Sequence, residues 1–148
     1  MKPTLAPFLM ALVLSTPGYG QDDSGRAAAA VFERFLTAMG NADIDTVTSL
    51  FAEDALFWGT GSQTLVTTPA GVLAYFTPVG RNEPGATIAR ARNYETRVLA
   101  DDMVMISGMW EIVPRGQDTG TPLRVSMLLE NRDGQWLVIQ FHNSRVPE

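Results

Sequence analysis

The chain has 148 residues, of which 45% are hydrophobic and 18% charged, a balance that fits one folded domain. It contains no cysteine, which excludes disulfides, thiol nucleophiles, iron–sulfur clusters and cysteine-ligated zinc. The formal net charge of −5 and the lack of any Lys/Arg cluster argue against nucleic acid as a partner, because proteins bind nucleic acid largely through Lys and Arg on phosphate.

The first twenty residues have the pattern of a secretory signal peptide. Lys2 supplies a positive start, Leu5–Leu14 is an apolar stretch, and the small residues Gly18 and Gly20 fit a cleavage site that places Gln21 first in the mature chain. The alternative is a membrane anchor, but the stretch has about half of the roughly 20 apolar residues that a spanning helix needs. We expect export to the periplasm or the medium, with no membrane attachment after cleavage.

Helical patterns follow. After a polar lead-in at 21–25, apolar residues recur at spacings of three and four over residues 26–39, which predicts an amphipathic helix. Asp43 is placed to cap a second, shorter helix. Ala55–Trp58 has the pattern of a short strand, and Thr68 followed by proline predicts the start of a third helix.

The rest of the chain has strand patterns. Side chains alternate with a period of two over Thr87–Leu99, Met103–Val113, Leu123–Asn131 and Trp136–Asn143. Helices followed by such a meander predict an α+β fold, in which one domain over 26–148 wraps a curved antiparallel sheet on the N-terminal helices. The pattern leaves the register of the first strand open by one residue, and a slip would turn its arginines to the other face.

The two faces of the predicted sheet differ in composition. The inner face is almost wholly apolar and is expected to meet the helices, with Leu137, Ile139, Phe141 and Asn143 on it in the last strand. The outer face mixes apolar, polar and charged residues, including Trp136, Val138, Gln140 and His142. Such a mixture predicts a homodimer interface through Trp136, Gln140 and His142, the alternative being a solvated face.

Two motifs resemble the nuclear transport factor 2-like superfamily. They are Phe51-Ala52-Glu53-Asp54-Ala55, and Arg132-Asp133-Gly134-Gln135-Trp136 followed by FHNSRVP at 141–147. The ending resembles the SgcJ/EcaC-type branch of SnoaL-like proteins and is similar to the association domain of calcium/calmodulin-dependent kinase II. Over residues 26–147 the resemblance implies a cone-shaped fold with a pocket inside and a sheet-to-sheet dimer. It leaves the activity open, because the superfamily includes isomerases, cyclases, dehydratases, ligand binders and assembly domains.

The resemblance also bears on the chemistry of the pocket. In the kinase association domain, inward arginines bind small carboxylates, and the corresponding positions here are Trp110, Met127 and Asn143. A more apolar pocket is therefore implied. The candidates for lining it are Trp58, Tyr75, Tyr94, Trp110, Met127, Phe141 and Asn143.

Asp54 and His142 are the candidate catalytic residues. Asp54, desolvated beside Trp58, would become a base with a raised pKa, unless it only stabilises a turn. His142 is the sole histidine, and histidine is the side chain most often used as a general base, but strand alternation places it on the outer face, where a structural or interface role competes. No metal-ligand spacing and no cofactor fingerprint occurs in the sequence.

Three functions fit these observations. The domain binds a small, mostly apolar molecule without turnover, or it serves only for assembly. Alternatively, it isomerises, cyclises or dehydrates such a molecule by proton transfer, with Asp54, His142 or a tyrosine as the base. A pocket above about 300 Å³ with two converging titratable groups would indicate an enzyme. A dry pocket with one polar anchor would favour binding, and a filled interior would favour assembly.

Overall fold

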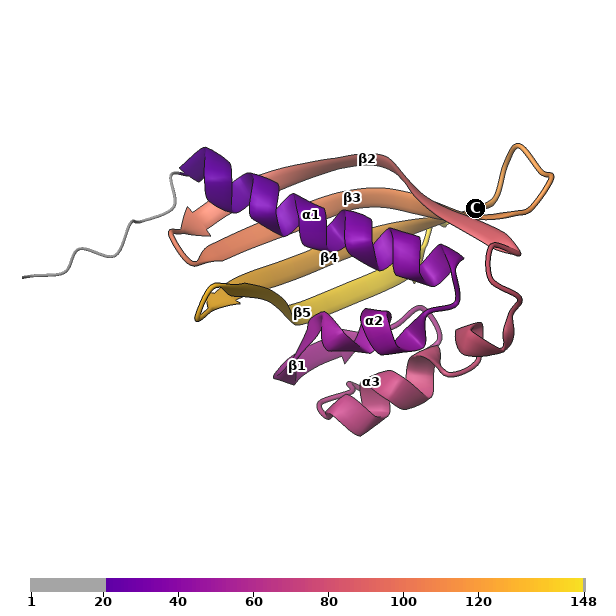
Figure 1. The fold of residues 1–148 in the computed structure, drawn as a ribbon, viewed down its shortest axis with the longest axis horizontal. Coiled ribbons are helices and arrows are strands. Elements are labelled where there is room, and N and C mark those ends of the chain that lie inside the picture. The colour runs from indigo at the N-terminus through magenta and orange to yellow at the C-terminus, as the bar shows by residue number, and fades with distance from the viewer. Residues whose placement is uncertain (1–20, 148) are drawn as a thin grey trace, which may run out of the picture.

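The computed structural model describes residues 21–147, so the expected signal peptide lies outside the described residues (Figure 1). The elements are α1 (Gln21–Gly40), α2 (Ile44–Ser49), β1 (Phe51–Trp58), α3 (Pro69–Phe76), a 3₁₀ turn (Val79–Arg81), β2 (Thr87–Ala100), β3 (Met103–Pro114), β4 (Thr121–Arg132) and β5 (Gln135–Arg145). Within 21–147, no helix combines the length and apolarity needed to cross a membrane.

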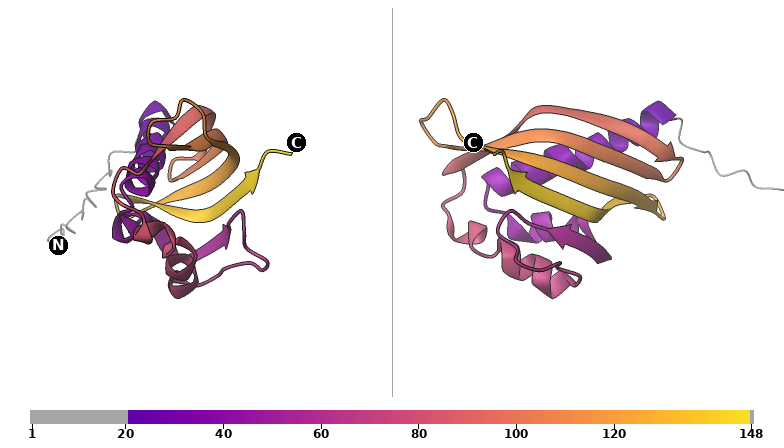
Figure 2. Two further views of the ribbon diagram at one scale, coloured as in Figure 1. Left: turned by 90° about the vertical axis from the view of Figure 1, so that its right-hand side faces the viewer. Right: turned by 180° about the vertical axis from the view of Figure 1, so that it is seen from behind.

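The five strands form one sheet in the order β1-β5-β4-β3-β2. Strands β2 to β5 make the predicted antiparallel meander, and β1 pairs in parallel with β5. The helices lie against one side of the sheet, here called the inner face, and Figure 2 shows the opposite, outer face without a helical cover. The predicted α+β cone is confirmed.

Local signals account for where the helices begin. The side chain of Asp43 accepts a hydrogen bond from the backbone N–H of Thr46 at 3.0 Å, as a helix cap does. Hydrogen bonding by the side chain and the backbone of Thr46 lowers the pKa of Asp43. Thr68 caps α3 in the same way through the N–H of Gly71. Helix α1, however, begins at Gln21, so the expected lead-in at 21–25 is helical.

Tertiary packing explains this early start. Ser24 is fully buried, and its hydroxyl donates to the backbone oxygen of Asp101, in the turn between β2 and β3, at 3.0 Å. The first turn of α1 is therefore fixed by a contact with a segment distant in sequence, which helical periodicity does not reveal.

Strand β5 contains a bulge that the sequence pattern did not indicate. Leu128 pairs with Gln140, but the next residue, Leu129, pairs with Val138, so Ile139 is the extra residue. A single inserted residue reverses the alternation of side chains beyond it.

The bulge corrects the predicted faces of β5. Trp136 and Val138 point into the core, with 8% and 1% of their surface exposed, whereas Leu137 and Ile139 are only partly buried. The predicted faces of these four residues were therefore wrong, because each points to the side of the sheet opposite to the expected one. Trp136 is therefore part of the core and is not available for a dimer interface, while Gln140 and His142 keep their outer positions.

A second bulge settles the register of β2. Ala91 pairs with Trp110 and Asn93 pairs with Met109, which leaves Arg92 as the extra residue. The charged residues of this strand are exposed, namely Arg90, Arg92, Glu95 and Arg97. Arg90 forms an ion pair with Glu111 at 2.7 Å, which lowers the pKa of that carboxyl group.

Aromatic side chains form the centre of the core. The rings of Phe57 and Phe141 stack with centroids 5.1 Å apart, and the ring of Phe35 meets those of Phe76 and Trp110 edge to face at 6.0 and 5.6 Å. Such pairs contribute about 0.5–1.5 kcal/mol beyond the burial of area. They join α1, α3 and the inner face of the sheet into the wall of the cavity described next.

Candidate functional site

A cavity of about 290 Å³ lies at the end of the cone where β5 ends. Its walls come from the second half of α1, from α3, from the loop after β1 and from the inner faces of β3, β4 and β5. The lining residues are Phe35, Met39, Thr60, Tyr75, Phe76, Val79, Trp110, Ile112, Thr121, Leu123, Phe141, Asn143 and Arg145. Most of these side chains are apolar, and the exposed ones, Thr121 and Arg145, mark the mouth.

One buried chain of hydrogen bonds crosses the wall. The indole Nε1–H of Trp110 donates to Oδ1 of Asn143 at 2.9 Å, and Nδ2 of Asn143 donates to Oγ1 of Thr60 at 2.7 Å. An indole can only donate, so its partner atom on the amide must be the oxygen, which sets the orientation of Asn143. The cavity thus has a polar anchor that is held in one orientation from both sides.

Few lining groups can change their charge. Of the described residues that line the cavity, Tyr75 and Arg145 are the titratable ones, and none is Asp, Glu or His. Within residues 21–147, no group of three or more His, Asp or Glu side chains is arranged to hold a metal ion. The lining therefore offers shape, apolar surface and hydrogen bonds rather than an acid–base pair.

The structure places four of the seven candidate pocket residues on this wall, namely Tyr75, Trp110, Phe141 and Asn143. Met127 is fully buried in the core and does not reach the cavity. Tyr94 packs edge to face on Phe32 and donates its hydroxyl hydrogen to Glu33 at 3.1 Å, outside the cavity. Burial and this carboxylate raise the pKa of Tyr94.

Trp58 also lies elsewhere. It is 40% exposed and sits beside His142 in the β1–β5 pairing. Residues paired across neighbouring strands share a face, and His142 is on the outer face. The expectation that Trp58 lines the pocket and desolvates Asp54 is therefore wrong.

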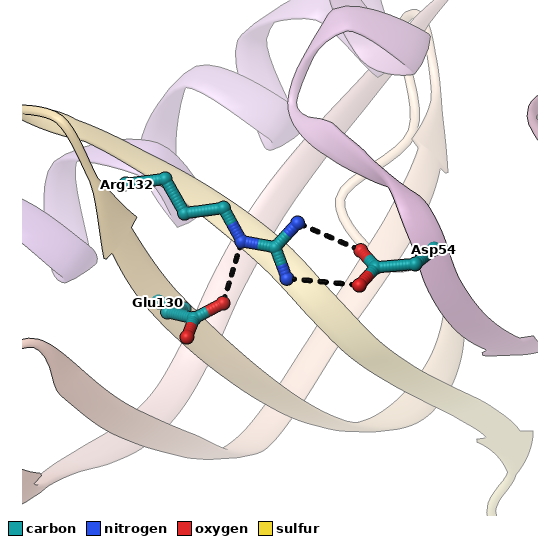
Figure 3. Close-up of polar contacts among 3 residues, drawn as sticks. All are labelled: Asp54, Glu130 and Arg132. Atoms are coloured by element: carbon teal, nitrogen blue, oxygen red, sulfur yellow. Dashed lines mark hydrogen bonds and ion pairs between the residues drawn. The ribbon is translucent and has the colours of Figure 1, made fainter.

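Asp54 forms part of an ion-pair clamp (Figure 3). The guanidinium of Arg132 donates to both carboxylate oxygens of Asp54, at 2.8 and 3.1 Å, and its Nε–H donates to Glu130 at 2.6 Å. These bonds hold the pKa of Asp54 below its usual value, which contradicts the expected raised pKa. The clamp ties the edge strand β1 to β4, and Asp54 does not line the cavity.

His142 lies on the opposite side of β5 from Asn143, as strand alternation predicted, and is exposed. It lines a second hollow of about 490 Å³ on the outer face, and the other titratable residues of that lining are Tyr94, Glu95 and Arg124. This hollow is larger than the inner cavity, and its lining is polar and apolar in nearly equal parts, whereas the inner cavity is mainly apolar. The two candidate catalytic residues thus lie apart from the inner cavity.

Sequence reasoning missed Thr60 and Arg145. Thr60 lies in a Gly/Thr/Ser-rich loop with no periodicity, so only the fold brings it to Asn143. Arg145 could have been predicted, because it follows Asn143 by two residues in the same strand and its side chain is therefore on the same, inner face of the sheet.

The sequence profile of the SnoaL-like domain family matches residues 28–148. No curated protein matches the chain. Among solved structures, a proposed calcium/calmodulin-dependent protein kinase II association domain from Xanthomonas campestris is 25% identical with a TM-score of 0.72, over 83% of this chain and 88% of that one.

Two further structures are similar in fold. One is a proposed dehydratase of the nuclear transport factor 2-like family from Streptomyces avermitilis, with 15% identity, a TM-score of 0.72, and coverage of 87% of this chain and 100% of that one. The other is a ketosteroid isomerase-like protein from Erwinia carotovora atroseptica, with 17% identity, a TM-score of 0.68, and coverage of 86% and 99%.

Proposed function

The chain belongs to the SnoaL-like domain family, and from that premise we propose that its cavity binds a small, mostly apolar molecule without chemical turnover. The observation that carries the proposal is the composition of the cavity wall. Aromatic and aliphatic side chains surround a single buried polar anchor at Trp110, Asn143 and Thr60. Ligand sites typically combine such apolar walls with a few placed polar groups.

The size of the cavity limits the ligand. At the roughly 30 Å³ that a water molecule occupies in the liquid, 290 Å³ holds about ten non-hydrogen atoms. A molecule with one ring and a short side chain matches this volume.

The same wall argues against proton-transfer catalysis. A general base must come within hydrogen-bond reach of the proton that it removes. Tyr75 is the one candidate base on the described lining, which contains no carboxylate or histidine to pair with it, and Asp54 is engaged by Arg132 elsewhere. The similar structures include a proposed dehydratase and an isomerase-like protein. Their likeness to this chain supports a cavity that can hold a ligand, but it does not supply the catalytic residues that the lining lacks.

The test is to identify small molecules that co-purify with the protein by mass spectrometry. Val79→Trp would fill the cavity from its rim, whereas Leu73→Trp adds the same ring at an exposed site of α3 outside the cavity. We expect a small molecule in the wild type and in Leu73→Trp, and its loss in Val79→Trp. Equal retention by all three proteins would place the molecule outside the cavity.

We also propose that the outer face pairs with a second copy of the chain. Apolar side chains there include Leu56, Trp58 and Met105, each 40–45% exposed. Leu56 neighbours Gln140 across the β1–β5 pairing, so the patch is continuous with the part of the predicted interface that remains on this face. Sedimentation should show a dimer that Leu56→Arg dissociates and that the equally exposed helix variant Leu73→Arg leaves intact.

Export is the remaining proposal. It is supported by the apolar stretch and the small residues before Gln21. The mass of the protein recovered from the periplasm or medium should correspond to a chain that begins at Gln21. A full-length mass in the cytoplasmic fraction would contradict it.

A further inference from the structure

One large apolar side chain projects from the outer face of the sheet. Trp58, in the edge strand β1, is 40% exposed, whereas Trp110 and Trp136 have only 1% and 8% of their surface exposed. A strand side chain stands roughly perpendicular to its sheet, so the indole of Trp58 points away from the protein. Tryptophan is one of the residues that most often carry the binding energy of an interface, which makes Trp58 a candidate contact.

The same face contains a hollow that can receive such a side chain. This outer hollow of about 490 Å³ is lined by residues of β2 to β5. Two small residues, Ser107 of β3 and Ser126 of β4, lie at its middle, and their hydroxyl oxygens are 3.4 Å apart. Longer side chains flank the serines, with Glu95 of β2 on one side and His142 of β5 on the other. This difference in length leaves a depression over the two serines.

The indole and the hollow lie in one row across the sheet. Trp58 pairs with His142, His142 pairs with Ser126, and Ser126 pairs with Ser107. Neighbouring strands are about 4.8 Å apart, so the two serines lie about 10–14 Å from Trp58 along the row. The side chain of His142 stands between them. The indole therefore cannot fill the hollow of its own chain, and the side chain that fits this hollow has to come from another molecule.

A twofold axis matches the two features to each other. In a twofold dimer the same patch of both copies meets, so each contact occurs twice. An axis parallel to the strands, placed between β4 and β5, lays β1 of each copy over β3 of the other, and Trp58 then faces the partner's Ser107. In the next row, Leu56 of β1 faces Met105 of the partner's β3 in the same way. Both are apolar and at least 40% exposed, so this arrangement covers the apolar patch together with the hollow.

Size and polarity agree with this placement. A tryptophan side chain has about ten non-hydrogen atoms, which at roughly 30 Å³ each need about 300 Å³ and leave room for ordered water in the outer hollow. An indole N–H that becomes buried needs an acceptor, and the carboxylate of Glu95 and the serine hydroxyls of the lining are acceptors. Sheets that pack face to face keep their strands within about 30° of each other, which such an axis satisfies.

We propose that the outer faces pair by mutual insertion, in which Trp58 of each copy fills the outer hollow of the other over Ser107 and Ser126. This inference rests on the proposed dimer and goes beyond it, because it assigns the inserted residue, the hollow that receives it and the strands that cross. His142 then lies beside the axis and faces the partner's Ser126, which gives this histidine a place in the interface.

Tryptophan fluorescence tests the insertion in the unaltered protein. Trp110 and Trp136 are buried, so iodide in solution quenches chiefly an exposed Trp58. The protein is diluted through its dimer-to-monomer transition, which analytical ultracentrifugation follows in parallel. We expect the quenching constant to rise several-fold and the emission to move to longer wavelength as the dimer dissociates. Equal quenching of dimer and monomer would overturn the insertion.

Substitutions attribute the contact. Trp58→Ala removes the projecting indole and Ser107→Trp fills the hollow, and each should weaken the dimer at least about thirtyfold, as the loss of a dominant interface contact does. Leu73→Ala and Leu73→Trp make matched changes at an exposed site of α3 and should leave the dissociation constant unchanged. Combining Trp58→Ala with Ser107→Trp places a ring in the hollow from the other side of the interface. The double variant should therefore bind itself at least about tenfold more tightly than either single variant.

The outcomes separate this inference from the dimer itself. A dimer whose dissociation constant is unchanged by Trp58→Ala or by Ser107→Trp would overturn the insertion and leave the pairing of the outer faces intact. A wild type that sediments as a monomer at high micromolar concentration would overturn the dimer and the insertion together. Trp58 and Ser107 are both exposed in the single chain, and an unchanged far-ultraviolet circular dichroism spectrum verifies that each variant is folded.

Discussion

Replacing Trp110 with Phe should remove the indole N–H and leave Oδ1 of Asn143 without its donor inside the wall of the cavity. An unpaired buried acceptor costs about 1–3 kcal/mol. The smaller ring at a fully buried site adds about 1–2 kcal/mol of lost burial and packing. We therefore expect Trp110→Phe to lower the free energy of unfolding by about 2–5 kcal/mol.

Asn143→Leu removes the other partner and leaves the indole N–H of Trp110 unpaired, which should cost about 1–3 kcal/mol. Once both partners are gone, neither orphaned group remains. The double variant should therefore be about 1–2 kcal/mol more stable than the sum of the two single effects predicts.

Urea denaturation followed by far-ultraviolet circular dichroism gives the free energy of unfolding of the wild type, the two single variants and the double variant. This readout does not depend on tryptophan fluorescence, which the substitutions change. A coupling free energy below about 0.5 kcal/mol, the usual limit of additivity, would refute the hydrogen bond as a structural anchor. Trp136→Phe is the control, because the Nε1 of buried Trp136 has no partner among the described residues. It should cost at least about 1 kcal/mol less than Trp110→Phe.

Three other variants test separate parts of the structure. A Cβ at Gly59 would overlap the ring of Tyr75, so Gly59→Ala should lower the free energy of unfolding by about 1–3 kcal/mol and weaken the binding of hydrocinnamide, a neutral probe with one ring and a short side chain, in the cavity. An unchanged stability and affinity would contradict this contact. Because the Arg132 pair lowers the pKa of folded Asp54, its stabilisation is present above the unfolded pKa of about 3.9 and is lost as pH falls through the folded value. Asp54→Asn should therefore flatten the acid dependence of the melting temperature below about pH 4, and an unaltered slope would count against the clamp. Ser24→Ala should cost about 1 kcal/mol if α1 docks from its first turn, whereas a neutral change would indicate a frayed helix start.

The layout of the fold was predictable because its signals are local. Asp43 and Thr68 cap helices through bonds to residues only three positions away. The four meander strands are long enough for the period of two to identify them. Bulges at Ile139 and Arg92 escaped prediction, because a bulge is defined by the partner strand and leaves no mark on the alternation itself.

The candidate site was predictable only in part. Trp110, Phe141 and Asn143 follow from the inner face of the sheet and line the cavity. Thr60 reaches it through a hydrogen bond that spans 83 positions of sequence. Trp58 was expected to line the pocket beside Asp54, whereas its pairing with His142 places it on the outer face.

The most direct test of the binding cavity uses the indole N–H signals of the three tryptophans in a two-dimensional ¹H–¹⁵N spectrum. Trp110 lies on the cavity wall, Trp136 in the core and Trp58 on the outer face. Titration with neutral hydrocinnamide should shift the Trp110 signal in a saturable manner and leave the other two nearly unchanged. A dominant shift at Trp58, or none at Trp110 up to millimolar probe, would contradict ligand binding in the inner cavity.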